Sequence, residues 1–222
     1  EKIAEWVAGR RMEKKGQETV YCPRPIETVD CRQSKEIRIQ IRFPTLTERP
    51  SDDPTFWAPL IEEIKPIVRQ NRSTLIFTNN RRTCERISFL LNQDEEHRIA
   101  YAHHGSLSRE TRTEVEQRLK NGELAAIVAT SSLELGIDIG ALDVVLMIQT
   151  PPSIAATLPR IGRAGHGVGQ ISRGILFPTF GRDLLDAAVM GKGSLNKEIE
   201  EIHPIECPLD ILAQIIVSLC GI

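Results

Sequence analysis

Short apolar segments alternate with polar loops and amphipathic segments along this chain, and that alternation restricts the folds it can adopt. Five apolar segments have the length of β-strands: residues 75–77, 99–101, 125–128, 144–148 and 174–177. Most of them lead through a polar turn into apolar residues at helical spacing. Strands and helices that alternate in this way form a parallel sheet through right-handed crossovers, with helices on both faces. The sequence therefore predicts an α/β fold with an open parallel sheet in three layers.

The composition is that of a soluble globular protein, and its charge gives little indication of a partner. The 222 residues include 41% hydrophobic and 26% charged residues, enough for one domain of ordinary size with flanking segments. The formal net charge of -2 does not by itself indicate nucleic-acid binding. The arginines are nevertheless clustered, at Arg69, Arg72, Arg81, Arg82 and Arg86 and again at Arg160, Arg163 and Arg173. Such clusters favour an anionic partner, although most charge runs are only solvated faces.

Cysteine and histidine spacing predicts no metal site and no disulfide framework. The five cysteines are an odd number without a Cys-x-x-Cys pair. His103 and His104 have no carboxylate or cysteine at ligand spacing, so we expect one ring to bond locally and the other to face the polar loops. No signal peptide and no apolar run of about 18 to 20 residues is evident, which predicts a cytoplasmic protein.

Segments outside the alternating region predict further elements. Apolar spacing predicts a helix end at residues 1–7, strands at 19–29 and 36–43, a helix at 55–70 and another helix within 206–222. We expect Pro59 in the first turn of the 55–70 helix and Pro66 at a kink. The apolar stripe of the last helix has no local partner, so it predicts the start of a further domain.

Small polar residues follow three of the predicted strands. They are Thr78-Asn79-Asn80-Arg81, His103-His104-Gly105-Ser106 and Thr130-Ser131-Ser132. Open parallel sheets bind ligands beyond the carboxyl ends of their strands, where helix N-termini attract anions. Three such loops side by side would form a track for successive backbone phosphates. Alternatively these residues are only helix N-caps, and Ser131-x-x-Glu134 fits a capping box.

Two arginines and one carboxylate indicate a nucleotide. Arg160 and Arg163 share a helix face and can converge on one anion such as a transferring phosphoryl group, or they form a plain surface pair. Asp138 lies in an apolar segment and needs a partner, which an arginine, a ribose hydroxyl or a structural salt bridge would supply. The sequence has no Gly-x-x-x-x-Gly-Lys-Ser/Thr loop, so it predicts half of a motor.

These segments resemble the second RecA-like domain, the helicase C-terminal domain, of superfamily 2 DEAD/DEAH-type helicases. Residues 75–81 look like motif IV, residues 129–140 like motif V and residues 160–166 like motif VI. The wording of residues 103–110, 131–138 and 160–166 is most similar to the large helicase-related (Lhr) family. The similarity extends from residue 23 to residue 214, and its motifs occur in the correct order.

The resemblance implies an ATP-dependent helicase or translocase that unwinds DNA or RNA:DNA from a single-stranded 3′ tail, and a role in DNA repair. It implies that residues 1–19 end a first RecA-like domain, that residues 20–195 form the second, and that residues 196–222 lead into a winged-helix domain. The implied partners are single-stranded DNA or RNA and those flanking domains, with no membrane. ATP and Mg²⁺ would be bound mainly by the first domain, so the fragment alone would hold no cofactor and hydrolyse no ATP.

Carried over by motif, the resemblance also implies the site residues. Those that contact the strand backbone are Asn79, Arg81, His104, Gly105, Thr130 and Ser131. Those near the nucleotide are Gly136, Asp138, Arg160 and Arg163. The catalytic pair would be Arg160 and Arg163, with Arg163 as the arginine finger.

Pro159 departs from the family, which usually has Gln at this position. Proline removes a helical hydrogen bond, at a cost of about 3 kcal/mol in a straight helix, and is expected to break or kink the helix at Leu158. This departure keeps open a second function, a non-catalytic nucleic-acid-binding module with the same fold. A dinucleotide-binding oxidoreductase is disfavoured, because the sequence has no strand-Gly-x-Gly-x-x-Gly-helix unit.

Overall fold

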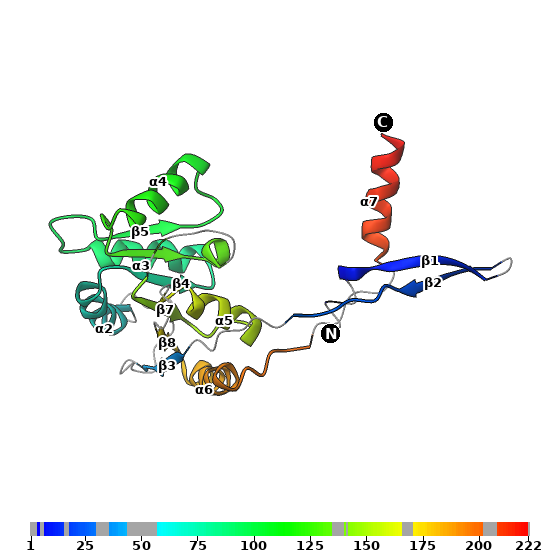
Figure 1. Ribbon diagram of the computed structural model, residues 1–222. Helices are drawn as coiled ribbons and strands as arrows, with labels where there is room; N and C mark the ends of the chain where they lie inside the picture. Colours follow the sequence, from blue (N-terminus) through cyan, green and yellow to red (C-terminus); the bar gives the residue numbers. More distant parts are fainter. Residues whose placement is uncertain are drawn as a thin grey trace. The chain divides into compact units, whose positions relative to one another are not determined.

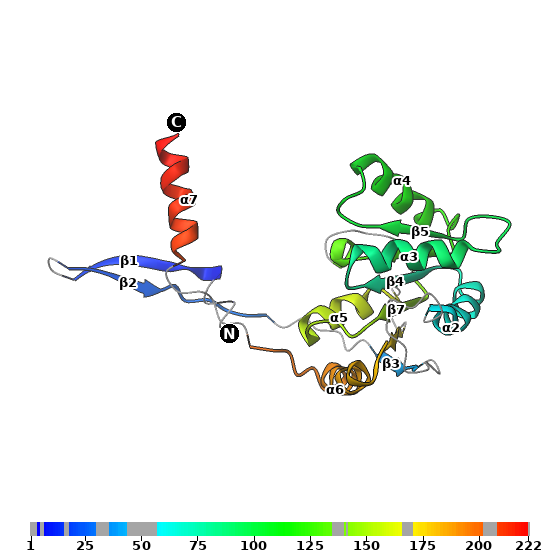
Figure 2. The same cartoon turned by 180° about the vertical axis from the view of Figure 1, so that it is seen from behind.

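The computed structural model divides the chain into two compact units (Figures 1 and 2). One unit comprises Glu1–Gln33 with Glu201–Ile222, and the other comprises Ser34–Glu200. The structure describes residues 4, 7–15, 18–29, 36–43, 57–134, 140, 142–165, 171–201 and 208–221.

The larger unit contains a six-stranded parallel sheet, which confirms the predicted α/β fold. Its strands are β3 (Ile37–Ile41), β4 (Thr74–Thr78), β5 (Ala100–His103), β6 (Ala126–Ala129), β7 (Val144–Ile148) and β8 (Ser172–Phe177). Their order in the sheet is β3-β8-β7-β4-β6-β5, and every neighbouring pair is parallel. The central strands β4, β6 and β7 are buried throughout, as expected of a parallel sheet covered on both faces.

Helices cover both faces of the sheet and form two hydrophobic clusters. They are α2 (Trp57–Gln70), α3 (Arg81–Asn92), α4 (Arg109–Lys120), α5 (Ile154–Gly162) and α6 (Gly181–Asn196). Ile76 of β4 packs in a cluster with residues of α2 and α3, whereas its neighbours Leu75 and Phe77 pack in a cluster with residues of α4, α5 and α6. The alternation of side chains along β4 thus assigns the two helical layers to opposite faces.

Helix α5 continues through Pro159, so the expected break at Leu158 is wrong. The missing proline N–H leaves the carbonyl of Ala155 without its helical donor, and Ala155 is exposed, so water can replace the bond. The N-terminus of the helix is well capped: the carboxylate of Glu200 accepts from the backbone N–H groups of Ile154 at 2.6 Å and Ala155 at 3.0 Å. These backbone bonds hold the pKa of Glu200 below its usual value. Helix α2 likewise continues through Pro66.

The described residues of the smaller unit include a hairpin and the helix α7. Strands β1 (Arg10–Lys15) and β2 (Glu18–Pro23) pair antiparallel, and α7 (Leu209–Cys220) forms as its apolar spacing predicts. Strand β1 was not predicted, because its charged sequence lacks apolar alternation. The domain boundaries at residues 19/20 and 195/196 stay predictions. In the described part of the chain, every helix is too short or too polar to cross a bilayer.

Candidate nucleic-acid and nucleotide site

The three polar loops lie at the carboxyl ends of neighbouring strands. Ala129 at the end of β6 is aligned with Phe77 of β4 on one side and with His103 of β5 on the other. Thr78 Oγ1 donates to the carbonyls of Asn80 at 3.2 Å and Ala129 at 3.4 Å. We name residues 78–81, 103–106 and 130–132 the strand-end loops. Their expected side-by-side arrangement is present.

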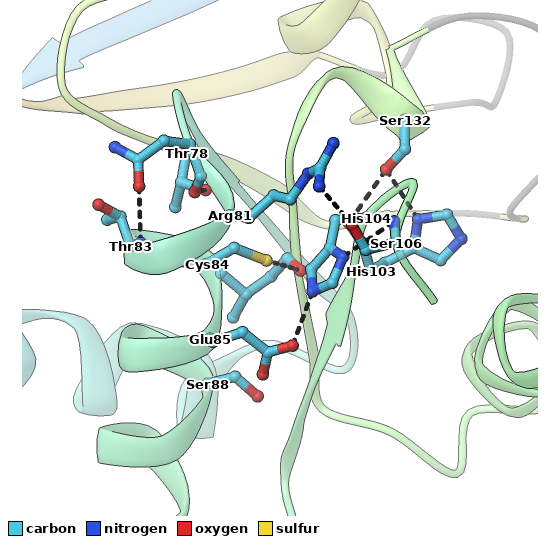
Figure 3. A network of polar contacts seen from close by, with 12 residues as sticks. Thr78, Arg81, Thr83, Cys84, Glu85, Ser88, His103, His104, Ser106 and Ser132 are labelled. Carbon is cyan, nitrogen blue, oxygen red and sulfur yellow. Dashed lines mark hydrogen bonds and ion pairs between the residues drawn. The ribbon is translucent and has the colours of Figure 1, made fainter. Parts of the chain in front are cut away.

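Side-chain bonds join the strand-end loops to one another (Figure 3). The guanidinium of Arg81 donates to the hydroxyl of Ser106, which connects the loop after β4 to the loop after β5. Ser132 Oγ donates to the carbonyl of His103 at 3.0 Å, which connects the loop after β6 to the end of β5. The backbone N–H of Thr130 also donates to that carbonyl, at 3.3 Å. The three loops therefore form one hydrogen-bonded edge.

Both histidine rings are buried, and each has one ring nitrogen bonded to a residue of the strand-end loops. His103 is fully buried between Ser132 Oγ, 2.9 Å from Nδ1, and Glu116 Oε1, 2.9 Å from Nε2. Burial lowers the pKa of His103, and the Glu116 carboxylate opposes this effect. His104 is 5% exposed, with Nε2 at 2.6 Å from Glu85 Oε1 and Nδ1 accepting from the backbone of Ser106. The ring of His104 thus connects the loop after β5 to Glu85 of α3 from its buried side.

Helix capping explains only one of the strand-end loops. The side chain of Asn80 accepts from the backbone N–H of Thr83 at 2.8 Å and caps α3. The cap of α4 is Ser108, outside the loop, and Thr130 makes no side-chain cap to the short 3₁₀ helix Ser131–Leu133. The capping box at residues 131–134 is therefore wrong: the Glu134 carboxylate is paired with Arg160 instead.

The solvent-facing residues of these loops suit an anion. Asn79, Arg81, Gly105 and Ser131 are exposed, and Thr130 is half-buried. Helix α3 starts with two arginines and no acid in its first turn, against the preference of a helix N-terminus for negative charge. A Cβ added at Gly105 would meet no atom within 4 Å, so folding leaves this surface open. Such a local conflict between charge and dipole is typical of a binding surface.

Arg160 and Arg163 converge on one residue, Glu134. The side chain of Arg160 is 5% exposed, and its terminal nitrogen lies 3.2 Å from Glu134 Oε2. Its guanidinium carbon lies 5.1 Å from the centre of the Phe77 ring. Arg163 is half-buried and donates from Nε and a terminal nitrogen to the backbone carbonyl of Glu134, at 3.3 and 2.8 Å. The two side chains thus meet at one residue of the protein, and their expected convergence on one anion stays a prediction.

Two predicted nucleotide residues, Gly136 and Asp138, lie outside the described residues. Glu134, Glu85 and Glu116 were missed by sequence reasoning, although each bonds a residue that it singled out. For Glu134 a signal existed, an acid within motif V and two arginines in motif VI, but it was assigned to a local cap. Glu85 and Glu116 lie one helix away from their histidines and give no local signal.

Comparison with known proteins identifies the family to which this fold is similar. Residues 58–167 match the family model described as the helicase conserved C-terminal domain. The chain is 34% identical to Lhr helicase/probable uracil glycosylase of Mycolicibacterium smegmatis, over 100% of this chain and 16% of that protein. It is 38% identical to the ATP-dependent helicase Lhr-Core of Sulfolobus acidocaldarius, over 86% of this chain and 23% of that protein.

A solved structure is similar as well. The structure of Mycobacterium smegmatis helicase Lhr bound to ssDNA and AMP-PNP matches with a TM-score of 0.79 and 41% identity, over 85% of this chain and 25% of that one. The chain thus spans about a quarter or less of the length of these relatives. It belongs to the family of helicase conserved C-terminal domains, in a form similar to that of Lhr helicases.

Proposed function

We propose that this chain is the second motor domain of an ATP-dependent nucleic-acid helicase, and that the strand-end loops hold the backbone of a single strand. The observation that carries the proposal is the joining of three loops at neighbouring strand ends into one hydrogen-bonded edge. Exposed Asn79, Arg81, Gly105 and Ser131, with half-buried Thr130, contact phosphates. His104 positions its loop through Glu85 rather than by direct contact. The similar Lhr helicase was solved with ssDNA and AMP-PNP bound, which supports a strand and a nucleotide for this chain too.

The two arginines have different roles in this proposal. Arg163 acts on the phosphates of ATP as the arginine finger, with Gly136 and Asp138 near the nucleotide. Arg160 is buried and ion-paired, so it positions motif V against α5. ATP and Mg²⁺ are held mainly by a first RecA-like domain, and the domain boundaries follow the sequence prediction. An arginine finger contributes about 10³- to 10⁵-fold to the rate of phosphoryl transfer.

Hydrolysis and strand binding measured separately in the full-length protein test the proposal. Arg163→Ala should reduce strand-stimulated ATP hydrolysis at least about a thousandfold and leave strand affinity within about twofold. Arg182→Ala, at an exposed site on α6, is the matched control. Loss of strand binding together with hydrolysis in Arg163→Ala would assign that arginine a structural role. The 222-residue chain alone should hydrolyse no ATP, because it lacks a phosphate loop.

Salt titration tests the strand surface. Arg81→Ala should weaken binding of every single strand similarly and reduce the slope of log affinity against log salt by about one. An unchanged slope would remove Arg81 from the phosphate contacts. Unwinding of DNA and RNA:DNA duplexes with 3′ or 5′ tails tests the proposed 3′ to 5′ direction and the substrate.

The alternative, a non-catalytic binding module, rested on Pro159 as a helix breaker. Because α5 continues through Pro159, that sequence argument no longer favours it. ATP hydrolysis by the full-length protein separates the two functions directly.

A further inference from the structure

A hollow adjoins the strand-end loops beyond Asn79. Its volume is about 520 Å³, within the range of about 300 to 1,000 Å³ typical of small-ligand sites. It lies at the carboxyl ends of β4 and β7 and at the start of α6. Asn79 belongs both to the hollow and to the strand-end loops, and its amide donates to the carbonyl of Thr150 at 3.0 Å. The hollow therefore continues the edge along which the proposed strand lies.

The side chains that line this hollow suit a ligand with a flat apolar face. Phe180 caps the start of α6 without a side-chain cap bond, and it is 53% exposed. Two residues of the segment after β7, Pro151 and Pro152, also line the hollow. Val189 of α6 contributes an exposed apolar side chain. An exposed aromatic ring at the edge of a strand-binding surface offers a stacking platform for a base.

The charge of the hollow excludes a phosphate. Asp183 and Asp186 both line it. Asp183 is buried and accepts from the backbone N–H groups of Thr150 at 2.9 Å and Thr179 at 2.8 Å, so it fixes the two segments that form the walls. Asp186 is exposed, one turn further along the helix. Carboxylates repel phosphate oxygens but accept hydrogen bonds from the exocyclic amino groups of bases.

Gln149 is held in a conformation that side chains rarely adopt. Its φ of 69° is in the left-handed region, and its backbone N–H donates to the carbonyl of Phe177 at 3.0 Å. Strained non-glycine residues cluster at binding sites, where the surrounding structure maintains them. The side chain of Gln149 is half-buried and lines the hollow, where its amide offers both a donor and an acceptor.

We infer that this hollow receives one nucleobase of the bound strand, next to the nucleotide at Asn79, with the base stacked on Phe180 and an exocyclic amino group facing Asp186. Adenine, cytosine and guanine carry such a group, whereas thymine and uracil do not. The pocket therefore confers a preference at one position of the strand. This inference rests on the proposed strand binding and adds a base contact to it.

Single strands with one 2-aminopurine at successive positions, bound to the full-length protein, test the inference. Wild type should quench the fluorescence strongly at one position. Phe180→Ala should remove that quenching and weaken affinity about three- to tenfold, with the salt slope unchanged because no phosphate contact is lost. Leu185→Ala is the matched control, since Leu185 is an exposed apolar residue of α6 outside the hollow. Thermal melting confirms that both variants are folded.

Base preference provides a second readout. Asp186→Asn should reduce the preference for an adenine or cytosine over a thymine at the quenched position, without affecting oligothymidine affinity. Normal strand binding with equal quenching in Phe180→Ala and Leu185→Ala would overturn the base pocket and leave the proposed function standing. Failure of the wild type to bind single strands at all would instead overturn the proposed function.

Discussion

Breaking the ion pair between Arg160 and Glu134 should destabilise the fold far more than removing Arg163. The side chains of Arg160 and Glu134 are 5% and 17% exposed, so Arg160→Met leaves a carboxylate without a partner in a mostly dry site. Removal of one partner from a buried pair costs about 3 to 5 kcal/mol, and the partial exposure of Glu134 places the expected cost near about 3 kcal/mol. For a unit of this size that corresponds to a fall in Tm of roughly 6 to 12 °C.

Arg163→Ala provides the contrast. Its side chain is half-buried and bonds a backbone carbonyl, so its loss should cost about 1 kcal/mol. The double variant Arg160→Met/Glu134→Gln should be more stable than Arg160→Met, because it contains no unpaired charge. The coupling energy between the two positions is expected at about 1 to 3 kcal/mol.

Urea unfolding of the 222-residue chain, followed by circular dichroism, measures these differences at constant m-value. Arg182→Met removes an exposed arginine from α6 and should change stability by less than about 0.5 kcal/mol. Equal destabilisation by Arg160→Met and Arg163→Ala would refute the division of roles. Additivity in the double variant would show that Arg160 and Glu134 do not act as a pair.

Two further predictions concern the supports of the site. Because burial lowers the pKa of His103, the fold favours its neutral form; stability should be full above about pH 6.5 and fall as the pH drops below it. His103→Asn should flatten the pH dependence of stability measured by urea unfolding between pH 5 and 7.5. His97→Asn, at an exposed site, is the control. If both variants show the same dependence of stability on pH, His103 is not the source of the effect. A Cβ at Gly174 would lie 2.8 Å from Cγ1 of Ile161, so Gly174→Ala should cost about 1 to 3 kcal/mol. Ile161→Ala in that background should destabilise less than it does alone, and simple additivity of the two changes would argue against the clash.

The sequence was informative wherever structure is local. Apolar runs in β4, β6 and β7 have few alternatives to buried parallel strands, so the fold and the three strand-end loops could be predicted. Strand order could not, because it depends on which crossovers pack together. In that order the loop after β6 lies between the loops after β4 and β5, so the three loops form one continuous edge.

Long-range pairing was the main limit on predicting the site. Glu134 has two local roles open to it, as a cap or as a free acid, and nothing within one turn of the chain distinguishes these from a bond to an arginine 26 positions later. The two histidines have the same difficulty. Their partners, Glu85 and Glu116, lie on helices that only the folded sheet brings to the end of β5.

The position of α5 is determined by several supports, which explains why Pro159 does not disturb it. Glu200 caps the first two backbone N–H groups of α5. Glu134 accepts from both arginines at the end of α5. Ile161 packs against the bare Cα of Gly174 in β8. One missing hydrogen bond at an exposed carbonyl is small beside these three contacts. Two of them involve the last turn, after the proline, so the direction of Arg163 is set by Glu134 and by β8 rather than by the continuity of the helix. Pro159 can therefore leave the contacts of Arg160 and Arg163 with Glu134 intact.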